Sequence, residues 1–278
     1  IKKPVNFGFL DFSTLEKRKY FCEEEIRLNK RLCPDIYLDV LPITTEDNNI
    51  LLNRKGKIID YALKMKEFPQ EKIMTNLLKK GEINIQIIEK ICDILIDFYK
   101  NGEQSKEIDN FGSVKSVKLN IDENFEQTEF AIGISIPKNT YKSIQKISNE
   151  FLNKKEDIFN WRIKHGFIHD CHGDLHSGNI VVDEKIYIFD CIEFNERFRY
   201  CDVASDLSFL AMDLDYLNFP FLSSYLIKYY IEKSKDIEIL NVINLYKSYR
   251  AYVRGKVTSF RLNDSSIDNN ERDEIIKI

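Results

Sequence analysis

Four polar residues with the chemistry of a catalytic or metal-binding site lie close together in the chain. His172, Asp174 and Asn179 share one glycine-containing segment, and Asp190 follows a predicted β-hairpin. Carboxylate and amide oxygens are ligands that Mg²⁺ prefers when it binds together with a nucleotide, since the ion also keeps phosphate oxygens and waters. The carboxylate of Asp174 could in addition face an attacking hydroxyl group. These residue types predict metal-assisted transfer of a phosphoryl group.

The hairpin explains how two of these residues would meet. Two β-rich runs flank a short polar turn centred on Glu184. Pairing about that turn places Asn179 opposite Phe189, so that Asp190 lies beside Asn179 at one end of the ladder. Asn179 and Asp190 are therefore the expected Mg²⁺ ligands. Asp174 lies on the same loop as Asn179, which suits a group that acts next to the metal.

Several motifs together carry a resemblance to a known family. The spacing H-x-D-x-x-x-x-N, then a hairpin and Asp, is that of the catalytic and metal-binding loops of protein kinases. The string H-G-D-L-H-S-G-N at 172–179 resembles the aminoglycoside phosphotransferase family, kinase-like enzymes that phosphorylate small molecules. The strings G-F-L-D-F-S-T-L-E at 8–16, F-D-C-I-E-F-N at 189–195 and Y-R-A at 249–251 narrow the resemblance to one bacterial branch.

Members of that branch often carry a second, C-terminal P-loop ATP-binding kinase domain. No G-x-x-x-x-G-K-[ST] string occurs in these 278 residues, so such a domain is an expected partner only in a longer protein. The first residue is Ile1, and residues 1–5 read like the end of a strand. We therefore expect the natural N-terminus, with the strands that cover the nucleotide phosphates, to precede Ile1.

The resemblance implies a role for each residue that matches the family pattern. It implies that Asp174 accepts or orients the proton of the substrate hydroxyl, while Asn179 and Asp190 hold Mg²⁺. It also implies that Glu25 pairs with a lysine that binds the α and β phosphates of ATP. Lys2 is the preferred lysine, and Lys3 or a lysine before Ile1 are the alternatives.

Further residues complete the implied site. Main-chain groups of Met65, Lys66 and Glu67, where predicted strands give way to helices, would receive the adenine. His172 and the buried Asp206 would support the catalytic loop without taking part in the reaction. The expected cofactors are ATP and Mg²⁺, and the expected partner is a small molecule with a hydroxyl group.

The element pattern predicts an α+β fold, a two-lobed protein-kinase-like fold with a truncated strand-rich N-lobe at 1–68 and a large helical C-lobe at 69–278. The first helix is expected over 13–32, from a capping box at Ser13 to the residues before Pro34. Glu25 falls in the middle of the apolar stripe of this helix, which calls for a cationic partner. Antiparallel strands are expected over 36–68.

Helices are expected to make up most of the remainder. Four helices are predicted at 73–80, 83–100, 113–130 and 141–164, with a polar loop at 101–110. The chain after residue 202 is predicted to be mostly helical, with breaks at 218–220 and 234–236.

Composition excludes several classes of protein. Hydrophobic residues make up 43% and charged residues 31%, and the net charge is −4. This balance is typical of a folded globular protein and argues against general binding of nucleic acid or anionic membranes. Six scattered cysteines without a C-x-x-C pair favour a reducing, cytoplasmic location.

Two other functions compete with the phosphotransferase interpretation. A kinase-like nucleotide-binding module that has lost catalysis would need the same fold. A metal-dependent phosphohydrolase would use the cluster of possible ligands His169, Asp170, His172, Asp174 and His176. Such sites gather ligands from distant loops, whereas this cluster is local.

The charge pattern does not decide which kind of molecule accepts the phosphoryl group. Residues 190–215 hold seven acidic and two basic residues, which would suit a cationic acceptor. Residues 245–261 hold five basic residues and no acidic one. On a helix Lys247, Arg250, Arg254 and Arg261 would form a stripe that could face an anionic acceptor, another domain or solvent.

Overall fold

The structure, a computed structural model, describes residues 1–47, 49–263 and 267–276. It divides into two compact units. The first comprises Ile1–Gly102 with Asp170–Arg199, and the second Glu103–His169 with Tyr200–Ile278. Strands are concentrated in the N-terminal part and helices in the remainder, which confirms the predicted α+β class. The predicted boundary at residue 68 falls inside the first unit, and the division into lobes stays a prediction.

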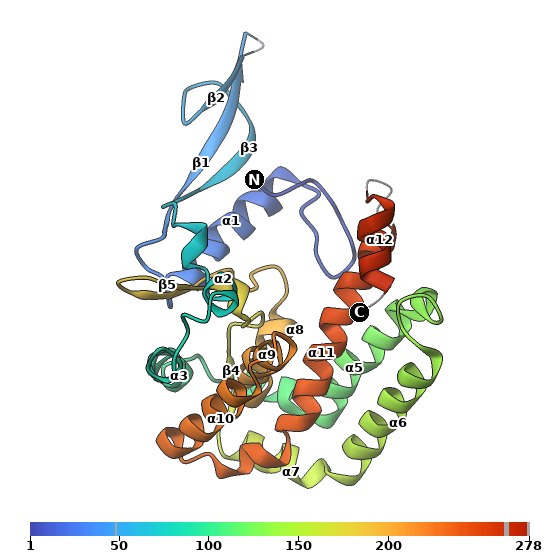
Figure 1. The fold of residues 1–278 in the computed structure, drawn as a ribbon. Coiled ribbons are helices and arrows are strands. Elements are labelled where there is room, and N and C mark those ends of the chain that lie inside the picture. The colour runs from blue at the N-terminus through green and yellow to red at the C-terminus, as the bar shows by residue number, and fades with distance from the viewer. Residues whose placement is uncertain (48, 264–266, 277–278) are drawn as a thin grey trace. The chain divides into compact units, whose positions relative to one another are not determined.

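An antiparallel sheet forms the strand-rich part of the first unit. Its strands are β1 (Tyr37–Glu46), β2 (Asn49–Leu52) and β3 (Lys57–Met65), in the order β2-β1-β3 (Figure 1). The strands predicted over 36–68 are therefore confirmed. Tyr37, at the start of β1, is buried in a small core with Cys33 and Ile36, where the sheet approaches the candidate site.

Helix α1 (Leu15–Asn29) packs against β1 and β3. Its N-cap is Thr14, whose hydroxyl accepts a hydrogen bond from the Lys17 amide at 3.2 Å, so the prediction of Ser13 as the cap is wrong by one residue. The Ser13 hydroxyl instead donates to Asp11 at 2.6 Å, which removes it from the helix end. The helix also stops before residue 32, because residues 30–32 form a turn ahead of the proline.

The segment before α1 corrects a second prediction. Within the described chain, residues 1–5 form no strand. The chain instead reverses at Gly8, where φ is +80°, a conformation that glycine adopts readily. The Phe12 amide donates to the Val5 carbonyl at 2.8 Å, and Asn6 pairs with Asp11. A local turn therefore provides hydrogen bonds for main-chain groups that would otherwise pair with a further strand.

The first unit is completed by helices and a second hairpin. These elements are α2 (Met74–Lys79), α3 (Ile85–Lys100), β5 (Ile180–Val182), β6 (Ile186–Ile188) and α8 (Glu196–Arg199). The two predicted helices at 73–80 and 83–100 are confirmed. The β5–β6 hairpin has Val182 opposite Ile186, as the turn about Glu184 predicts. Ile73, just before α2, pairs with Val181 and ties α2 to the hairpin.

The second unit is mainly helical. Its elements are α4 (Lys106–Asp109), α5 (Val114–Gln127), α6 (Lys138–Lys154), α7 (Glu156–Lys164), α9 (Val203–Tyr216), α10 (Pro220–Ser234), α11 (Ile243–Phe260) and α12 (Asn269–Ile276). Short strands β4 (Ile168–Asp170) and β7 (Tyr200–Asp202) pair. In this unit 3₁₀ turns occupy Asn110–Gly112, Glu129–Ala131, Ile237–Asn241 and Arg261–Asn263, and in the first unit they occupy Gln70–Lys72 and Ser177–Asn179. Helix α9 is buried over residues 203–214 and packs against α10 and α11.

Two expectations for the second unit need correction. The helix predicted over 141–164 is two helices, because Lys155 leaves helical geometry with φ −123° and ψ 24°. The loop predicted at 101–110 contains α4, which Ser105 caps by accepting from the Ile108 amide at 3.2 Å. The predicted breaks at 218–220 and 234–236 are confirmed. In the described part of the chain, no helix is both long and apolar enough to cross a membrane.

Candidate active site

A lysine in the first unit is held between two glutamates. The Nζ atom of Lys2 is 2.7 Å from Oε2 of Glu25 on α1, and it also contacts the carboxylate of Glu193. All three side chains are largely buried, with 11%, 15% and 8% of each side chain exposed, respectively. The structure thus brings together the two residues that the sequence analysis paired, and adds a third.

Burial and charge act against each other on this lysine. Burial alone would lower the pKa of Lys2, but Glu193 and Glu25 together raise it above its ordinary value, so the ammonium stays charged. Burial raises the pKa of Glu193, and the attraction of Lys2 offsets only part of that rise. The triad therefore holds one cation against two carboxylates, an arrangement with surplus negative charge.

The predicted catalytic carboxylate is fixed by the predicted metal ligand. The side-chain amide of Asn179 donates to the Asp174 carboxylate at 3.1 Å and to the Asp174 carbonyl at 3.0 Å. Both residues lie on the loop that ends in the 3₁₀ turn Ser177–Asn179. Ser177 anchors this turn through a 2.6 Å hydrogen bond with Thr75 of α2. Because the nitrogen of the Asn179 amide is engaged by Asp174, its oxygen is the atom that could ligate a metal.

The hairpin brings Asp190 to the same place. The Phe189 amide donates to the Asn179 carbonyl at 3.0 Å, so Asp190 follows directly on the residue that faces Asn179. Asp190 has φ +63°, a conformation that aspartate tolerates better than most residues. Its amide donates to the Tyr37 hydroxyl at 3.2 Å, which ties the bend to β1.

The environment of Asp190 suits a divalent cation. The pKa of Asp190 is raised to about 6. Burial is the largest cause, and the nearby Asp174 and Glu25 carboxylates also contribute. A cation bound beside Asp190 would favour its ionised form, which Asp174 and Glu25 oppose. The Asp190 carboxylate and the amide oxygen of Asn179 are hard oxygen donors of the kind that Mg²⁺ prefers.

Two histidines hold the loop from either end. The His172 ring accepts from the Asp174 amide through Nδ1 at 3.3 Å, which leaves Nε2 as the protonated atom that donates to the Phe189 carbonyl at 3.0 Å. His172 thereby joins the catalytic loop to the strand before Asp190. His176 accepts from the Gly178 amide at 3.0 Å, and its Nε2 lies 3.5 Å from the Asp174 carboxylate.

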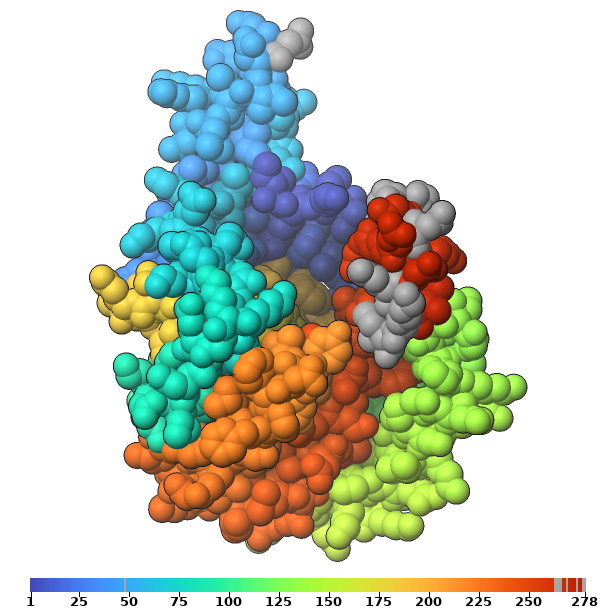
Figure 2. Space-filling view, in the orientation of Figure 1, coloured from blue at the N-terminus to red at the C-terminus, as the bar shows by residue number. Residues whose placement is uncertain are grey.

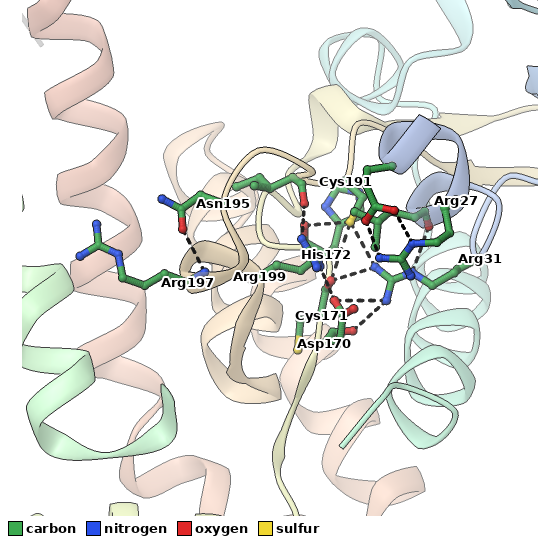
Figure 3. Close-up of polar contacts among 12 residues, drawn as sticks. Arg27, Arg31, Asp170, Cys171, His172, Cys191, Asn195, Arg197 and Arg199 are labelled. Carbon is green, nitrogen blue, oxygen red and sulfur yellow. Dashed lines mark hydrogen bonds and ion pairs between the residues drawn. The ribbon is translucent and has the colours of Figure 1, made fainter. Parts of the chain in front are cut away.

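A buried network supports the loop from the α1 side (Figure 3). The Arg199 guanidinium contacts the Asp170 carboxylate, and its Nη1 donates to the Ile192 carbonyl at 2.9 Å. Arg31, in the turn that follows α1, lies 3.3 Å from the same carboxylate and donates to the Cys171 carbonyl at 3.2 Å. These two arginines fix the chain on both sides of the site, before His172 and after Asp190.

The remaining predicted residues are placed as follows. Met65 ends β3, and the Lys66 amide donates to the Ile36 carbonyl at 2.8 Å, so that amide is already used within the sheet. Glu67 follows in a segment without regular structure. Asp206 is fully buried in the first turn of α9 in the second unit. The roles given to these residues stay predictions.

Sequence reasoning gave neither Glu193 nor Asp170 a role in phosphotransfer. Glu193 contacts Lys2 across 191 positions of chain, and only its place three residues after Asp190 could have drawn attention to it. Asp170 was considered only as a hydrolase ligand, and its pairing with Arg199 was missed. A buried acid beside an arginine-rich short helix is the signal that could have found that pair.

The hydrolase alternative gains no support from the described residues. Among them, no group of three or more His, Cys, Asp or Glu side chains is arranged to hold a metal ion. His169 faces the Gly166 carbonyl at 2.9 Å and the Gln104 amide at 3.0 Å, while His172 is engaged as above.

Comparison with known proteins gives relatives without an assigned activity. No protein-family model matches the chain. Proteins of Mycobacterium bovis and Mycobacterium tuberculosis, each named only as an uncharacterized protein, are 30% identical over 261 residues, or 94% of this chain. The chain spans 51% of the length of those curated relatives. Ethanolamine kinase from Plasmodium vivax is similar with 12% identity and a TM-score of 0.48, over 96% of this chain and 73% of the kinase chain.

Proposed function

We propose that this chain carries the centre of an ATP- and Mg²⁺-dependent phosphotransferase that moves the γ-phosphoryl group to a hydroxyl group of a small molecule. The observation that carries the proposal is the environment of Asp190. Its pKa of about 6 reflects burial and the neighbouring Asp174 and Glu25 carboxylates, and Glu25 in turn pairs with Lys2. Residues from distant positions in the sequence, which this proposal assigns to one phosphoryl-transfer centre, thus act on one another within a single unit.

Asp174 is the group that would face the acceptor. Its carboxylate would accept the proton of the hydroxyl as the hydroxyl oxygen bonds to the γ-phosphorus. The bond from that phosphorus to the bridging oxygen breaks, and ADP leaves with the electron pair. The Asn179 amide, which donates to Asp174 at 3.1 Å, would hold the carboxylate in the orientation that this step needs.

Asn179 and Asp190 would hold the metal. Bound Mg²⁺ would neutralise charge that develops on the phosphate oxygens. The bend at Asp190, fixed by the Tyr37 hydroxyl, would keep this carboxylate facing Asn179. Main-chain groups of Met65, Lys66 and Glu67 would receive the adenine, with the carbonyls favoured at Lys66 because its amide is bonded within the sheet.

Lys2 would bind the α and β phosphates while Glu25 orients it. Glu193 holds the same ammonium, so phosphates must compete with this carboxylate for Lys2. We assign Glu25 as the glutamate that keeps its ion pair with Lys2 when phosphates bind, and Glu193 as the glutamate that the phosphates displace. The burial that raises the pKa of Glu193 supports this choice, because it makes the ion pair with Glu193 costly to keep.

The test uses the protein at its full natural length with labelled ATP, Mg²⁺ and a panel of hydroxylated metabolites. Transfer of label to one acceptor class, lost in Asp174→Asn, would support the proposal. Tight ATP binding with no transfer to any acceptor or to water would favour the module without catalysis.

A further inference from the structure

A cavity of about 600 Å³ lies within the second unit and uses none of the residues assigned above to phosphotransfer. Pockets of 300 to about 1,000 Å³ are typical of small-molecule sites. Its walls come from α6, α9, α11 and α12, and Figure 2 shows the green segment of α6 beside the red segments of α11 and α12. Most of the lining is apolar, as at Ile144, Met212 and Ala251.

Gly255 opens space in this cavity. It lies in the interior of α11, where glycine is the least favourable residue after proline. A Cβ atom added at Gly255 would meet no heavy atom of the described residues within 4 Å. Neither close helix packing nor unusual backbone geometry therefore calls for glycine here. The space that a side chain would occupy is part of the cavity.

Charges at one end of the cavity are already balanced. Lys247 contacts Asp215, and Arg254 contacts Asp213 while its guanidinium lies 4.6 Å from the ring of Tyr216. The basic stripe predicted on this helix is thus largely neutralised by acidic neighbours. A charged ligand would have to disrupt one of these ion pairs, which disfavours both the anionic and the cationic acceptor at this place.

The lining thus offers apolar surface and charges that are already paired. We propose that the cavity binds an uncharged, mainly apolar small molecule. This inference stands independently of the proposed phosphotransfer.

The test uses two fluorescent naphthalene probes with the full chain. One is the neutral ketone 6-propionyl-2-(dimethylamino)naphthalene, and the other is the anionic 8-anilino-1-naphthalenesulfonate. We expect saturable binding of the neutral ketone, at least about tenfold tighter than binding of the sulfonate. Gly255→Leu, which fills the cavity, should weaken ketone binding at least about tenfold, whereas the matched Gly255→Ala should change it less than about threefold. Both variants replace glycine with a better helix former, so melting temperatures should not fall.

Retention of full ketone affinity in a folded Gly255→Leu variant would overturn the proposal. Equal or tighter binding of the sulfonate would overturn the assignment of an uncharged ligand.

Discussion

Each unit of the molecule holds one buried cation between two carboxylates, and the two triads differ in how fully they are satisfied. In the second unit, Arg162 donates to Asp236 at 2.9 and 3.0 Å and to Asp202 at 2.8 Å. Each acid also caps a helical turn: Asp202 accepts from the Ala204 amide at 2.8 Å, and Asp236 accepts from the Ile239 amide at 3.1 Å. This triad is closed, because the fork of the guanidinium and both carboxylates are fully used.

The triad of Lys2 is open by comparison, in the sense that one ammonium group serves two carboxylates without satisfying both. Its carboxylates come from Glu25 and Glu193, and Glu25 acts further on Asp190, whose pKa is raised mainly by burial to about 6. A lysine is a compact point charge that cannot satisfy two carboxylates as a guanidinium does. The comparison teaches that buried charge alone does not mark a site. Surplus negative charge that a metal ion could balance distinguishes the first unit from the second.

The largest expected effect comes from breaking the closed triad. Arg162→Met leaves two buried carboxylates without a cation and should lower the free energy of unfolding by about 3 to 5 kcal/mol. Lys2→Met is the matched variant in the open triad. It should cost clearly less, because Glu193 already has a raised pKa and can take up a proton. Denaturant unfolding of both variants measures the difference, and equal losses would contradict the distinction.

Removing the charge of Asp190 should separate binding from stability. Asp190→Asn should weaken Mg²⁺ binding on the order of 100-fold or more. It should also stabilise the metal-free protein by roughly 1 to 3 kcal/mol at neutral pH, because a carboxylate with a raised pKa is unfavourable when ionised. Calorimetric Mg²⁺ titration and thermal unfolding report the two effects. A variant that is less stable than the wild type would argue that Asp190 is structural.

The two carboxylates on Lys2 should have opposite effects on ATP. Glu193→Gln removes the competitor of the phosphates and should tighten ATP binding about tenfold, an energy of one charge-assisted hydrogen bond. Glu25→Gln removes the orienting partner and should weaken binding by a similar factor. Titration of ATP in the presence of Mg²⁺ compares them. Shifts in the same direction would show that the two glutamates are equivalent.

The smallest effect is the pH dependence of metal binding. Asp190 has a pKa of about 6, so Mg²⁺ must compete with a proton below that pH. Affinity should fall about twofold at pH 6 relative to pH 8 and about tenfold for each further pH unit. Stability runs the other way: the protonated form favours folding below about pH 4, and that contribution is lost as pH rises through 6. Asp190→Asn should flatten both profiles.

Much of this site could be predicted because its key pairs are local. The hairpin register follows from the turn about Glu184, and this places Asn179 next to Asp190. Glu25 stood out because a carboxylate on an apolar stripe needs a cation. Such arguments rely on short-range periodicity, which the sequence displays directly.

The features that could not be predicted depend on which of several nearby groups forms a given hydrogen bond, or on contacts made only in the folded chain. Thr14 rather than Ser13 caps α1, because Asp11 draws the Ser13 hydroxyl away. The turn at Gly8 replaces the expected strand, and Lys155 interrupts a helix whose periodicity continues across it. Glu193 reaches Lys2 only through tertiary structure, at a separation of 191 residues that no spacing rule covers.

The central claim is that Asp174 serves phosphoryl transfer in a centre built from Lys2, Asn179 and Asp190. The most direct measurement is the rate of phosphate transfer by the wild-type protein at its full natural length and by its Asp174→Asn variant, together with the ATP affinity of each. The account predicts a loss in rate of ~10² to 10⁴ with ATP affinity changed less than about threefold. An unchanged rate in Asp174→Asn, or a wild-type protein that binds ATP and Mg²⁺ but transfers phosphate to no acceptor, would contradict it.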